Sequence, residues 1–281
     1  MSTIIIEYYK YLILMTDGNI EDINKYISNA RLKSYLEACQ NDYIKALKLY
    51  QTNMRLSQSF YPLLSLVEVI LRNALNEKFT VYFNDDHWLI NQKDKIMKDS
   101  SLTYIDRKTG KTKNNYFLSD SISKSIEKSK SKPVTEGVII ADLNFGFWTA
   151  FFNKSHSALF RGVPMSIFVK LPSGYNRSKV AKILDKLREF RNRVYHNEPI
   201  IFKKQVNGLF EFNLLKVEST YQDIKSIFSW FNLDFKLWTK RIDHVAYEIE
   251  NVKCVVDNYP QNKYYLKRIL SDLKHYKELH I

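Results

Sequence analysis

The hydrophobic positions of this chain recur every three or four residues over long stretches, a spacing typical of amphipathic helices. The clearest such stretch predicts a helix from about Ser178 to about Asn197. At ~100° per residue, one sector roughly 80° wide holds four aliphatic side chains, those of Val180, Leu184, Leu187 and Val194. Pro199 follows, and the helix ends there because a proline ring cannot continue it.

One charged residue lies near the middle of that apolar sector. Arg191 shares the sector with aliphatic side chains, and an unpaired buried charge costs a great deal of free energy. Its guanidinium must therefore be paired, face a cleft or meet a partner subunit. His196 follows in the last turn, and histidine is the side chain best suited to proton transfer near neutral pH.

An arginine and a histidine beside a phosphodiester are sufficient to cleave RNA, which carries its own nucleophile, the 2′-OH. His196 would take or give a proton and Arg191 would stabilise charge on the phosphate, with no metal required. In a straight helix the two side chains point about 140° apart. They converge only if the last turn unwinds near Asn197 or if two copies meet across a dimer.

Two more helices are predicted earlier in the chain, at about 41–54 and 57–83. Pro62 falls in the first turns of the second helix, where proline is best tolerated. The second helix has an apolar face at helical spacing, formed by Phe60, Leu63, Leu64, Val67, Ile70, Leu71 and Ala74.

Three polar residues accompany that apolar face. Glu68 lies at its edge, Arg72 one turn later, and Asn73 follows. One interpretation is a surface ion pair between residues four apart, worth a few tenths of a kcal/mol. The other is a supporting group that holds Arg191 or His196 in place.

Most of the remaining chain is also predicted to be helical. The apolar stretch 143–152 is expected to pack in the core, 216–248 to form two amphipathic helices, and a last helix to begin at Pro260. Residues 3–15 fit a strand or a helix equally well. The dipeptide Asn207-Gly208, between two alternating runs, predicts a short β-hairpin, with a loop as the alternative.

Two histidines outside the key helix suggest no chemistry. His87 follows two aspartates, but adjacent side chains rarely chelate a metal without distant partners, so we expect a loop or a helix cap. His156 lies in a serine-rich turn and is expected to be solvated.

The segment 91–137 is polar and rich in Lys and Ser, with few apolar anchors. It holds the cluster R-K-T-G-K-T-K around Gly110, which predicts a turn with concentrated positive charge. The glycine spacing and the preceding strand of a P-loop are missing, so nucleotide binding is not expected. The segment is interpreted either as a solvated, partly mobile insertion or as a lobe that grips RNA.

The composition favours an all-α fold, because the 281 residues include only 7 Gly and 6 Pro. The expected organisation is an N-terminal extension (1–27), a main helical domain (28–248) and a C-terminal helix (249–281). The formal charge of +13 predicts attraction to a polyanion, with RNA the obvious candidate. The alternative is a lysine-rich surface that reflects an AT-biased genome.

The sequence also favours a cytoplasmic protein. Cys39 and Cys254 are its only cysteines, too few for a disulfide framework or a metal cluster. The apolar start lacks the basic region and the cleavage site of a signal peptide. No run reaches the ~18 apolar residues of a membrane span, so no membrane association is expected.

The motif R-N-x-x-x-H at the end of the key helix resembles the R-x4-6-H signature of the HEPN ribonuclease superfamily. Three longer stretches, SFYPLLSLVEVILRNAL, LNFGFWTAFF and LREFRNRVYHNEPI, resemble blocks of the Abi-like abortive-infection family of the AbiD/AbiF type. The resemblance covers about Arg31 to Tyr247, and residues 1–27 and the last thirty or so depart from it.

The resemblance implies an all-helical HEPN-type bundle and homodimers that bring two R-x4-H motifs together. It implies metal-independent RNA cleavage in phage defence, without a cofactor, by a motif that type VI CRISPR effectors share. Some AbiF-like proteins are thought to pair with a small structured RNA, so the alternative function is an RNA-binding protein whose cleavage is regulated or absent. A third interpretation is a structural protein in which Arg191 pairs inside a dimer interface.

The residue roles follow from that resemblance. Arg191 and His196 are the expected catalytic pair, with Asn192 orienting one of them or bonding the phosphate. Arg188 and Arg193, on neighbouring faces, are expected to contact the RNA backbone.

Overall fold

The structure is a computed structural model that describes residues 26–129, 135–231 and 234–257. It is 65% helical, with small two-stranded sheets as its β-structure, which confirms the mostly-α prediction. The chain divides into two compact units, and each is described by itself. The predicted segments 3–15 and the helix after Pro260 lie outside the described residues.

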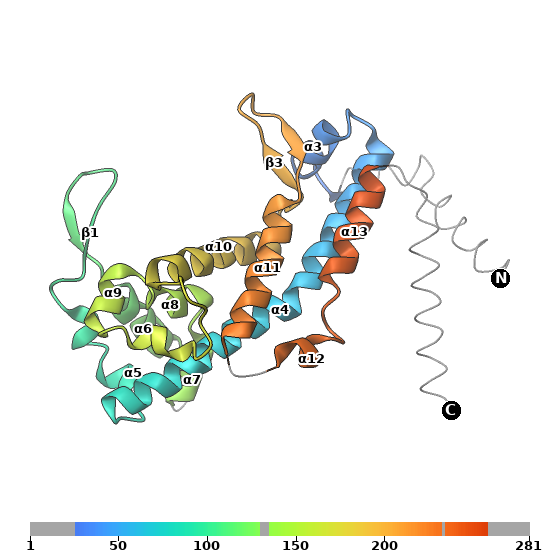
Figure 1. The fold of residues 1–281 in the computed structure, drawn as a ribbon. Coiled ribbons are helices and arrows are strands. Elements are labelled where there is room, and N and C mark those ends of the chain that lie inside the picture. Colours follow the sequence, from blue (N-terminus) through green and yellow to red (C-terminus); the bar gives the residue numbers. More distant parts are fainter. Residues whose placement is uncertain (1–25, 130–134, 232–233, 258–281) are drawn as a thin grey trace. The chain divides into compact units, whose positions relative to one another are not determined.

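Unit 1 comprises Met1–Leu56, Pro199–Leu215 and Ala246–Ile281. Its elements are α3 (Asn29–Ala38), the beginning of α4 (Tyr43–Phe83), the hairpin β3 (Phe202–Lys204) and β4 (Phe210–Phe212), and α13 (Val245–Val256) (Figure 1). The β3–β4 hairpin confirms the turn predicted at Asn207-Gly208, where Gly208 has a φ of 85°. The Tyr35 and Phe202 rings, 5.0 Å apart, pack the hairpin on α3.

Unit 2 comprises Ser57–Glu198 and Lys216–Val245. After most of α4 it contains α5 (Trp88–Asn91), η1 (Ile96–Lys98), β1 (Thr103–Ile105), β2 (Thr112–Asn114), α6 (Phe117–Lys128), α7 (Glu136–Asp142), α8 (Phe145–Ala150), α9 (Lys154–Leu159), η2 (Val163–Ile167), α10 (Arg177–Tyr195), α11 (Leu215–Trp230) and α12 (Phe235–Thr239).

The two helices predicted between 41 and 83 are one. α4 runs unbroken for 41 residues with Pro62 inside it, so the predicted break was wrong. The reason is a buried face that continues across the expected gap at helical spacing, through Leu49, Asn53, Leu56 and Phe60. Proline removes one backbone hydrogen bond, and the burial on both sides of it holds the helix together.

An aromatic cluster forms the core of unit 2 around α8. Phe79 of α4 lies 4.6 Å from Trp88, 4.9 Å from Phe151 and 4.8 Å from Phe160, measured between ring centroids. The stretch 143–152 therefore packs in the core, as predicted. Asn144 caps α8 by accepting a hydrogen bond from the Phe147 N–H at 3.1 Å, which orients the helix that reaches the candidate site.

His156 is not solvated, contrary to prediction. Its side chain is 1% exposed, and neither ring nitrogen makes a well-formed hydrogen bond with a described residue. Burial lowers the pKa of His156, and the nearby Ala150 carbonyl opposes that shift. The sequence did not show that the turn around it would fold against the aromatic cluster. His87, in contrast, occupies the N-cap position of α5, as expected, and its side chain makes no capping hydrogen bond there.

The described part of the polar segment 91–137 is more regular than its composition suggests. It contains η1, the β1–β2 hairpin and α6, and Met97, Leu102, Leu118 and Ile122 are all 0% exposed. A few apolar residues at the right positions are enough to attach it to the unit. The hairpin itself stands clear of the helices of its unit (Figure 1).

Candidate functional site

The candidate site lies on the C-terminal half of α10, which packs against α4, α8 and α11 within unit 2. The Phe190 ring lies 4.8 Å from the Phe60 ring on α4, and Phe60 also contacts Tyr221 on α11. Phe190 is 1% exposed, so the buried face of α10 is wider than the aliphatic stripe predicted. At ~100° per residue this moves Arg191 from the middle of the buried face toward its edge.

Arg191 is three-quarters buried and held from two sides. Its Nη2 lies 3.5 Å from Glu68 Oε2 on α4, and its side chain is 25% exposed. The guanidinium lies 4.2 Å over the ring of Tyr195, a geometry in which a cation is attracted to the ring face. Tyr195 in turn packs on Tyr61 with ring centroids 4.5 Å apart. The arginine is thereby fixed in place, and its Nε makes no hydrogen bond with a described residue.

Glu68 is the counter-charge of this arrangement. Burial raises the pKa of Glu68, and the charges of Arg191 and Arg72, together with the Phe145 backbone N–H at the start of α8, oppose that rise. The carboxylate thus meets α4, α8 and α10 at one point. Breaking one partner of a partly buried pair costs more than the pair contributes, so Glu68 both orients Arg191 and makes its burial tolerable.

The other two members of the predicted supporting group lie differently. Arg72 acts on Glu68 through its charge and donates to Asn73 Oδ1 at 3.4 Å. Asn73 is exposed, and at ~100° per residue it points about 140° away from Glu68. The structure therefore brings Glu68 to Arg191, leaves Arg72 near enough to Glu68 to act on it through its charge, and leaves Asn73 outside the ion pair.

The end of α10 is closed by a well-defined cap. The Asn197 N–H bonds to the Val194 carbonyl at 3.0 Å, the Glu198 N–H bonds to the Arg193 carbonyl at 2.9 Å, and Asn197 has a φ of 51°. This pair of bonds around a left-handed residue is the Schellman motif. His196 is the C-cap, and its N–H still bonds to the Asn192 carbonyl at 3.0 Å. The last turn does not unwind.

An exposed polar stripe follows from that regular ending. Arg188, Asn192 and His196 are each four residues apart and share one side of the helix, with Asn192 and His196 exposed. Arg191 borders the stripe, about 140° from His196, and donates to Asn192 Oδ1 at 3.5 Å. A single copy therefore presents the arginine and the histidine at opposite borders of one polar face.

The two predicted backbone-contacting arginines are both paired locally. Arg188 Nη2 lies 3.4 Å from Asp185, and Arg193 Nε lies 3.4 Å from Glu198. A Cβ at Gly146 would lie 3.0 Å from Asn144 Oδ1 and 3.5 Å from Arg188 Cδ. Gly146 thus lets α8 approach Arg188 closely.

Sequence reasoning missed Tyr195 and Tyr61. Tyr195 stands four residues after Arg191, a spacing at which side chains on a helix meet, and this signal was available. The contact of Tyr195 with Tyr61 and that of Glu68 with the Phe145 N–H could not be predicted. Nothing local in the sequence places α4 and α8 beside α10.

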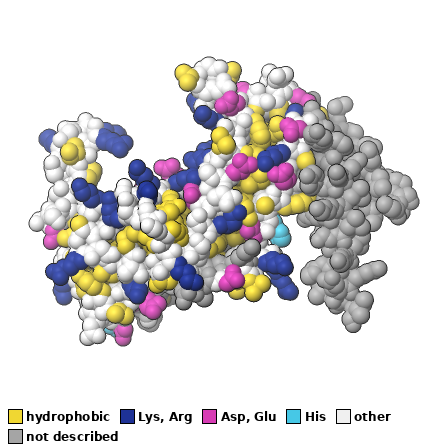
Figure 2. All heavy atoms as spheres, viewed as in Figure 1, with side chains coloured by type: hydrophobic (Ala, Val, Ile, Leu, Met, Phe, Trp, Pro, Cys, Tyr) yellow, Lys and Arg dark blue, Asp and Glu magenta, His cyan; other side chains and the backbone are white. Residues whose placement is uncertain are grey.

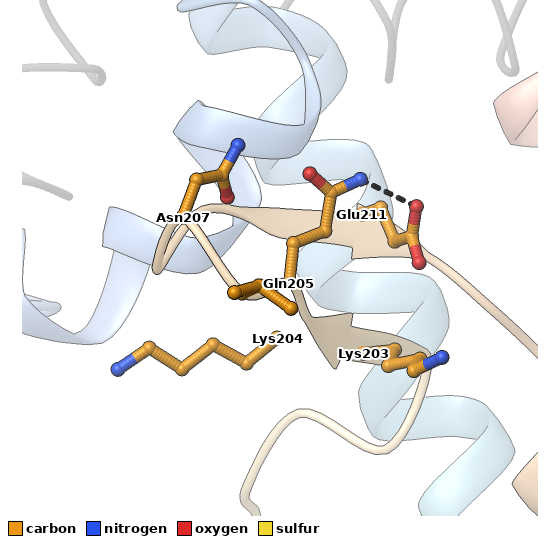
Figure 3. Close-up of a pocket in the computed structure, with 6 residues that line it drawn as sticks. Lys203, Lys204, Gln205, Asn207 and Glu211 are labelled. Atoms are coloured by element: carbon orange, nitrogen blue, oxygen red, sulfur yellow. Dashed lines mark hydrogen bonds between the residues drawn. The ribbon is translucent and has the colours of Figure 1, made fainter.

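A hollow of about 590 Å³ lies elsewhere, on the β3–β4 hairpin of unit 1, lined by Lys203, Lys204, Gln205, Val206, Asn207 and Glu211. Figure 3 shows the two lysine ammonium groups pointing in opposite directions, while Gln205 donates to Glu211 at 2.6 Å. None of the predicted site residues lines this hollow, and its lysines do not converge on one point.

The described residues contain no group of three or more His, Cys, Asp or Glu side chains arranged to hold a metal ion. Among their helices, none combines the length and the apolar character needed to cross a bilayer.

The chain matches the model of a known protein family. A family model described as Abi-like protein matches residues 16–201, a range that includes α4, α8, α10 and every candidate site residue. Searches of the curated proteins and of the solved structures return no match to the chain.

Proposed function

The chain belongs to the Abi-like protein family, and on that premise we propose that it is a metal-independent endoribonuclease. Membership of the family points to a role in abortive infection. The finer proposal is that it cuts RNA as a homodimer of HEPN type, with the R-x4-H motif of α10 as its catalytic element.

The observation that carries this proposal is the fixed position of Arg191. A purely structural ion pair needs only Glu68, yet the guanidinium is also stacked on Tyr195 and remains 25% exposed at the border of a polar stripe. A cation that is positioned from two sides and still accessible suits a phosphate, because preorganised charge stabilises a developing oxyanion best.

The chemistry requires one bond to form and one to break. The 2′-oxygen bonds to phosphorus and the P–O5′ bond breaks, leaving a 2′,3′-cyclic phosphate and a free 5′-OH. One proton leaves the 2′-OH and one reaches O5′. His196 acts as acid or base in this exchange, Arg191 stabilises charge on the phosphate, and Asn192 orients one of them.

A second copy supplies what one copy lacks. The Schellman cap keeps α10 regular through His196, so the alternative in which the last turn unwinds is not available to this conformation. The regular end of the helix supports the other route that the sequence left open, a dimer in which Arg191 of one copy would meet His196 of the other. Arg188 and Arg193 would contact the RNA backbone beside them.

Cleavage of a labelled single-stranded RNA in EDTA tests the proposal. Wild-type protein should cut and leave 2′,3′-cyclic phosphate ends, and His196→Ala should not. His244→Ala, at another exposed histidine, is the matched control and should cut normally. Cleavage that survives His196→Ala, or that stops in EDTA, removes this mechanism.

The charge of +13 favours a second candidate, an RNA-binding protein held in complex with a small structured RNA. Nucleic acid extracted from the purified protein distinguishes the two. One discrete small species, with no cleavage by the freed protein, supports the binding role, whereas cleavage by RNA-free protein supports the nuclease.

A further inference from the structure

The β1–β2 hairpin of unit 2 is a well-formed arm with no packing role along its strands. Every residue of both strands is exposed, although an isolated two-stranded hairpin is at best marginally stable in water. Its loop is fixed by Asp106, whose Oδ1 accepts from the N–H groups of Lys108 and Thr109 at 2.9 and 3.1 Å. Gly110, with a φ of 65°, completes the turn. The hydrogen bonds of the turn thus hold the hairpin together, although its strands bury no side chains.

The two faces of the hairpin differ in chemistry. Tyr104 pairs with Lys113, and directly opposed residues project to the same face. The next pair outward on that face is Asp106 with Lys111, where the Asp106 N–H donates to the Lys111 carbonyl at 2.9 Å. The other face carries the uncharged residues Thr103, Ile105, Thr112 and Asn114. One face therefore combines an aromatic ring with two lysines and the Asp106 carboxylate.

Most of the positive charges of this arm form no ion pair with a described residue. Arg107, Lys108, Lys111 and Lys113 outnumber the single carboxylate of Asp106, which pairs with Lys113. Arg107, Lys108 and Lys111 have no ion-pair partner among the described residues and are exposed. Figure 2 shows Lys and Arg side chains gathered around the tip of the hairpin.

The other hairpin, β3–β4, shows what a structural hairpin looks like in this protein. Its aromatic residues turn inward, with Phe202 8% exposed and against Tyr35. In β1–β2 the aromatic ring is instead 47% exposed, beside cations and away from any aromatic partner among the described residues.

We propose that the Tyr104–Lys111–Lys113 face of the β1–β2 hairpin, with Arg107 and Lys108 at its tip, binds single-stranded RNA. A base stacks on Tyr104 and the lysines contact the adjacent phosphates, the combination by which proteins hold single strands without reading sequence. A membrane fits less well, because Tyr104 and Ile105 point to opposite faces and cannot enter an apolar layer together. The inference deepens the proposed function by naming a surface for its substrate, but binding does not require cleavage.

Binding is measured by fluorescence anisotropy with a labelled single-stranded RNA of about 12 nucleotides, using the full chain with His196→Ala so that no cleavage occurs. Tyr104→Ala should weaken binding roughly tenfold, since one stacked base is lost. Tyr104→Phe should bind as before. Ile105→Ala is the matched control on the opposite face; it is 69% exposed and should not change affinity. Equal losses at Tyr104 and Ile105, or none at Tyr104, overturn the proposal.

The charge is tested separately by Arg107→Gln combined with Lys111→Gln. Losing two phosphate contacts should reduce the slope of log K against log salt by about 1.4. An unchanged slope overturns the proposal. So does a double variant that loses binding to anionic lipid vesicles or to an acidic peptide but binds RNA as before. If the hairpin variants lose RNA binding while the wild-type protein cuts no RNA, the inference stands and the proposed nuclease fails.

Discussion

Arg191 Nη2 on α10 lies 3.5 Å from Glu68 Oε2 on α4, and this ion pair ties the helix that carries the R-x4-H motif to the longest helix of the protein. Both side chains are partly buried, so the pair is neither an exposed surface contact nor a sealed core charge. It fixes a cation at the border between the hydrophobic core and an exposed polar stripe.

Replacing Glu68 by Gln should weaken both the fold and the activity. Arg191 would lose its counter-charge while staying three-quarters buried, at a cost of about 1 kcal/mol in the free energy of unfolding. RNA cleavage should fall because the guanidinium is no longer oriented. Urea unfolding and single-turnover cleavage measure the two effects. Glu77→Gln, at an exposed position on the same helix, is the control, and an equal loss there would contradict the role of Glu68.

Replacing Asn197, which has a left-handed backbone conformation, by alanine should destabilise the end of α10. Alanine tolerates a φ of 51° less well than asparagine, so Asn197→Ala should cost about 1 kcal/mol of stability. Asn197→Gly should cost nothing or stabilise slightly. Cleavage should follow the same order, because the cap sets the direction of His196. Chemical denaturation of both variants checks the first expectation, and a stable Asn197→Ala protein would argue against the cap.

A shared site predicts complementation between two inactive variants. If Arg191 of one copy works with His196 of the other, mixing Arg191→Ala protein with His196→Ala protein after subunit exchange should restore about a quarter of the wild-type activity. Half of the dimers are then mixed, and each has one intact pairing. Cleavage assays on the mixture and on each variant alone test this. A mixture as inactive as its components would mean that the pairing is not shared between copies.

His156 should make the fold sensitive to acid. Burial lowers the pKa of His156 from its ordinary value of 6.5, so the unfolded chain binds a proton more readily than the folded one. Its contribution to stability is therefore fully present above pH 6.5 and is lost as the pH falls toward the folded-state pKa.

His156→Leu should remove that dependence and, since a poorly satisfied buried polar group is replaced by an apolar one, raise stability by about 1 kcal/mol at pH 7. Melting temperatures of both proteins from pH 7.5 down to about pH 5 compare the two slopes. Parallel curves for the two proteins would show that another group causes any acid sensitivity.

The local pattern of residues determined more of the fold than of the site. Apolar spacing predicted α10 and its end before Pro199, the packing of 143–152 and the turn at Asn207-Gly208, because helix periodicity and turn chemistry are encoded within a few neighbouring residues. The family resemblance is confirmed, although the match covers 16–201 rather than the expected range of about Arg31 to Tyr247. The resemblance rested on short stretches of the same kind. The expected domain boundaries, the partners and the roles of the site residues stay predictions.

Only the tertiary structure decided what surrounds each of those residues. It joined two predicted helices into α4, buried His156, and placed Phe190 so that Arg191 stands toward the edge of the buried face rather than at its middle. It also brought Glu68 and Tyr195 into contact with the guanidinium, and Tyr61 into contact with Tyr195. Such contacts depend on which elements pack together, and packing partners far apart in the chain leave no periodic trace in the sequence.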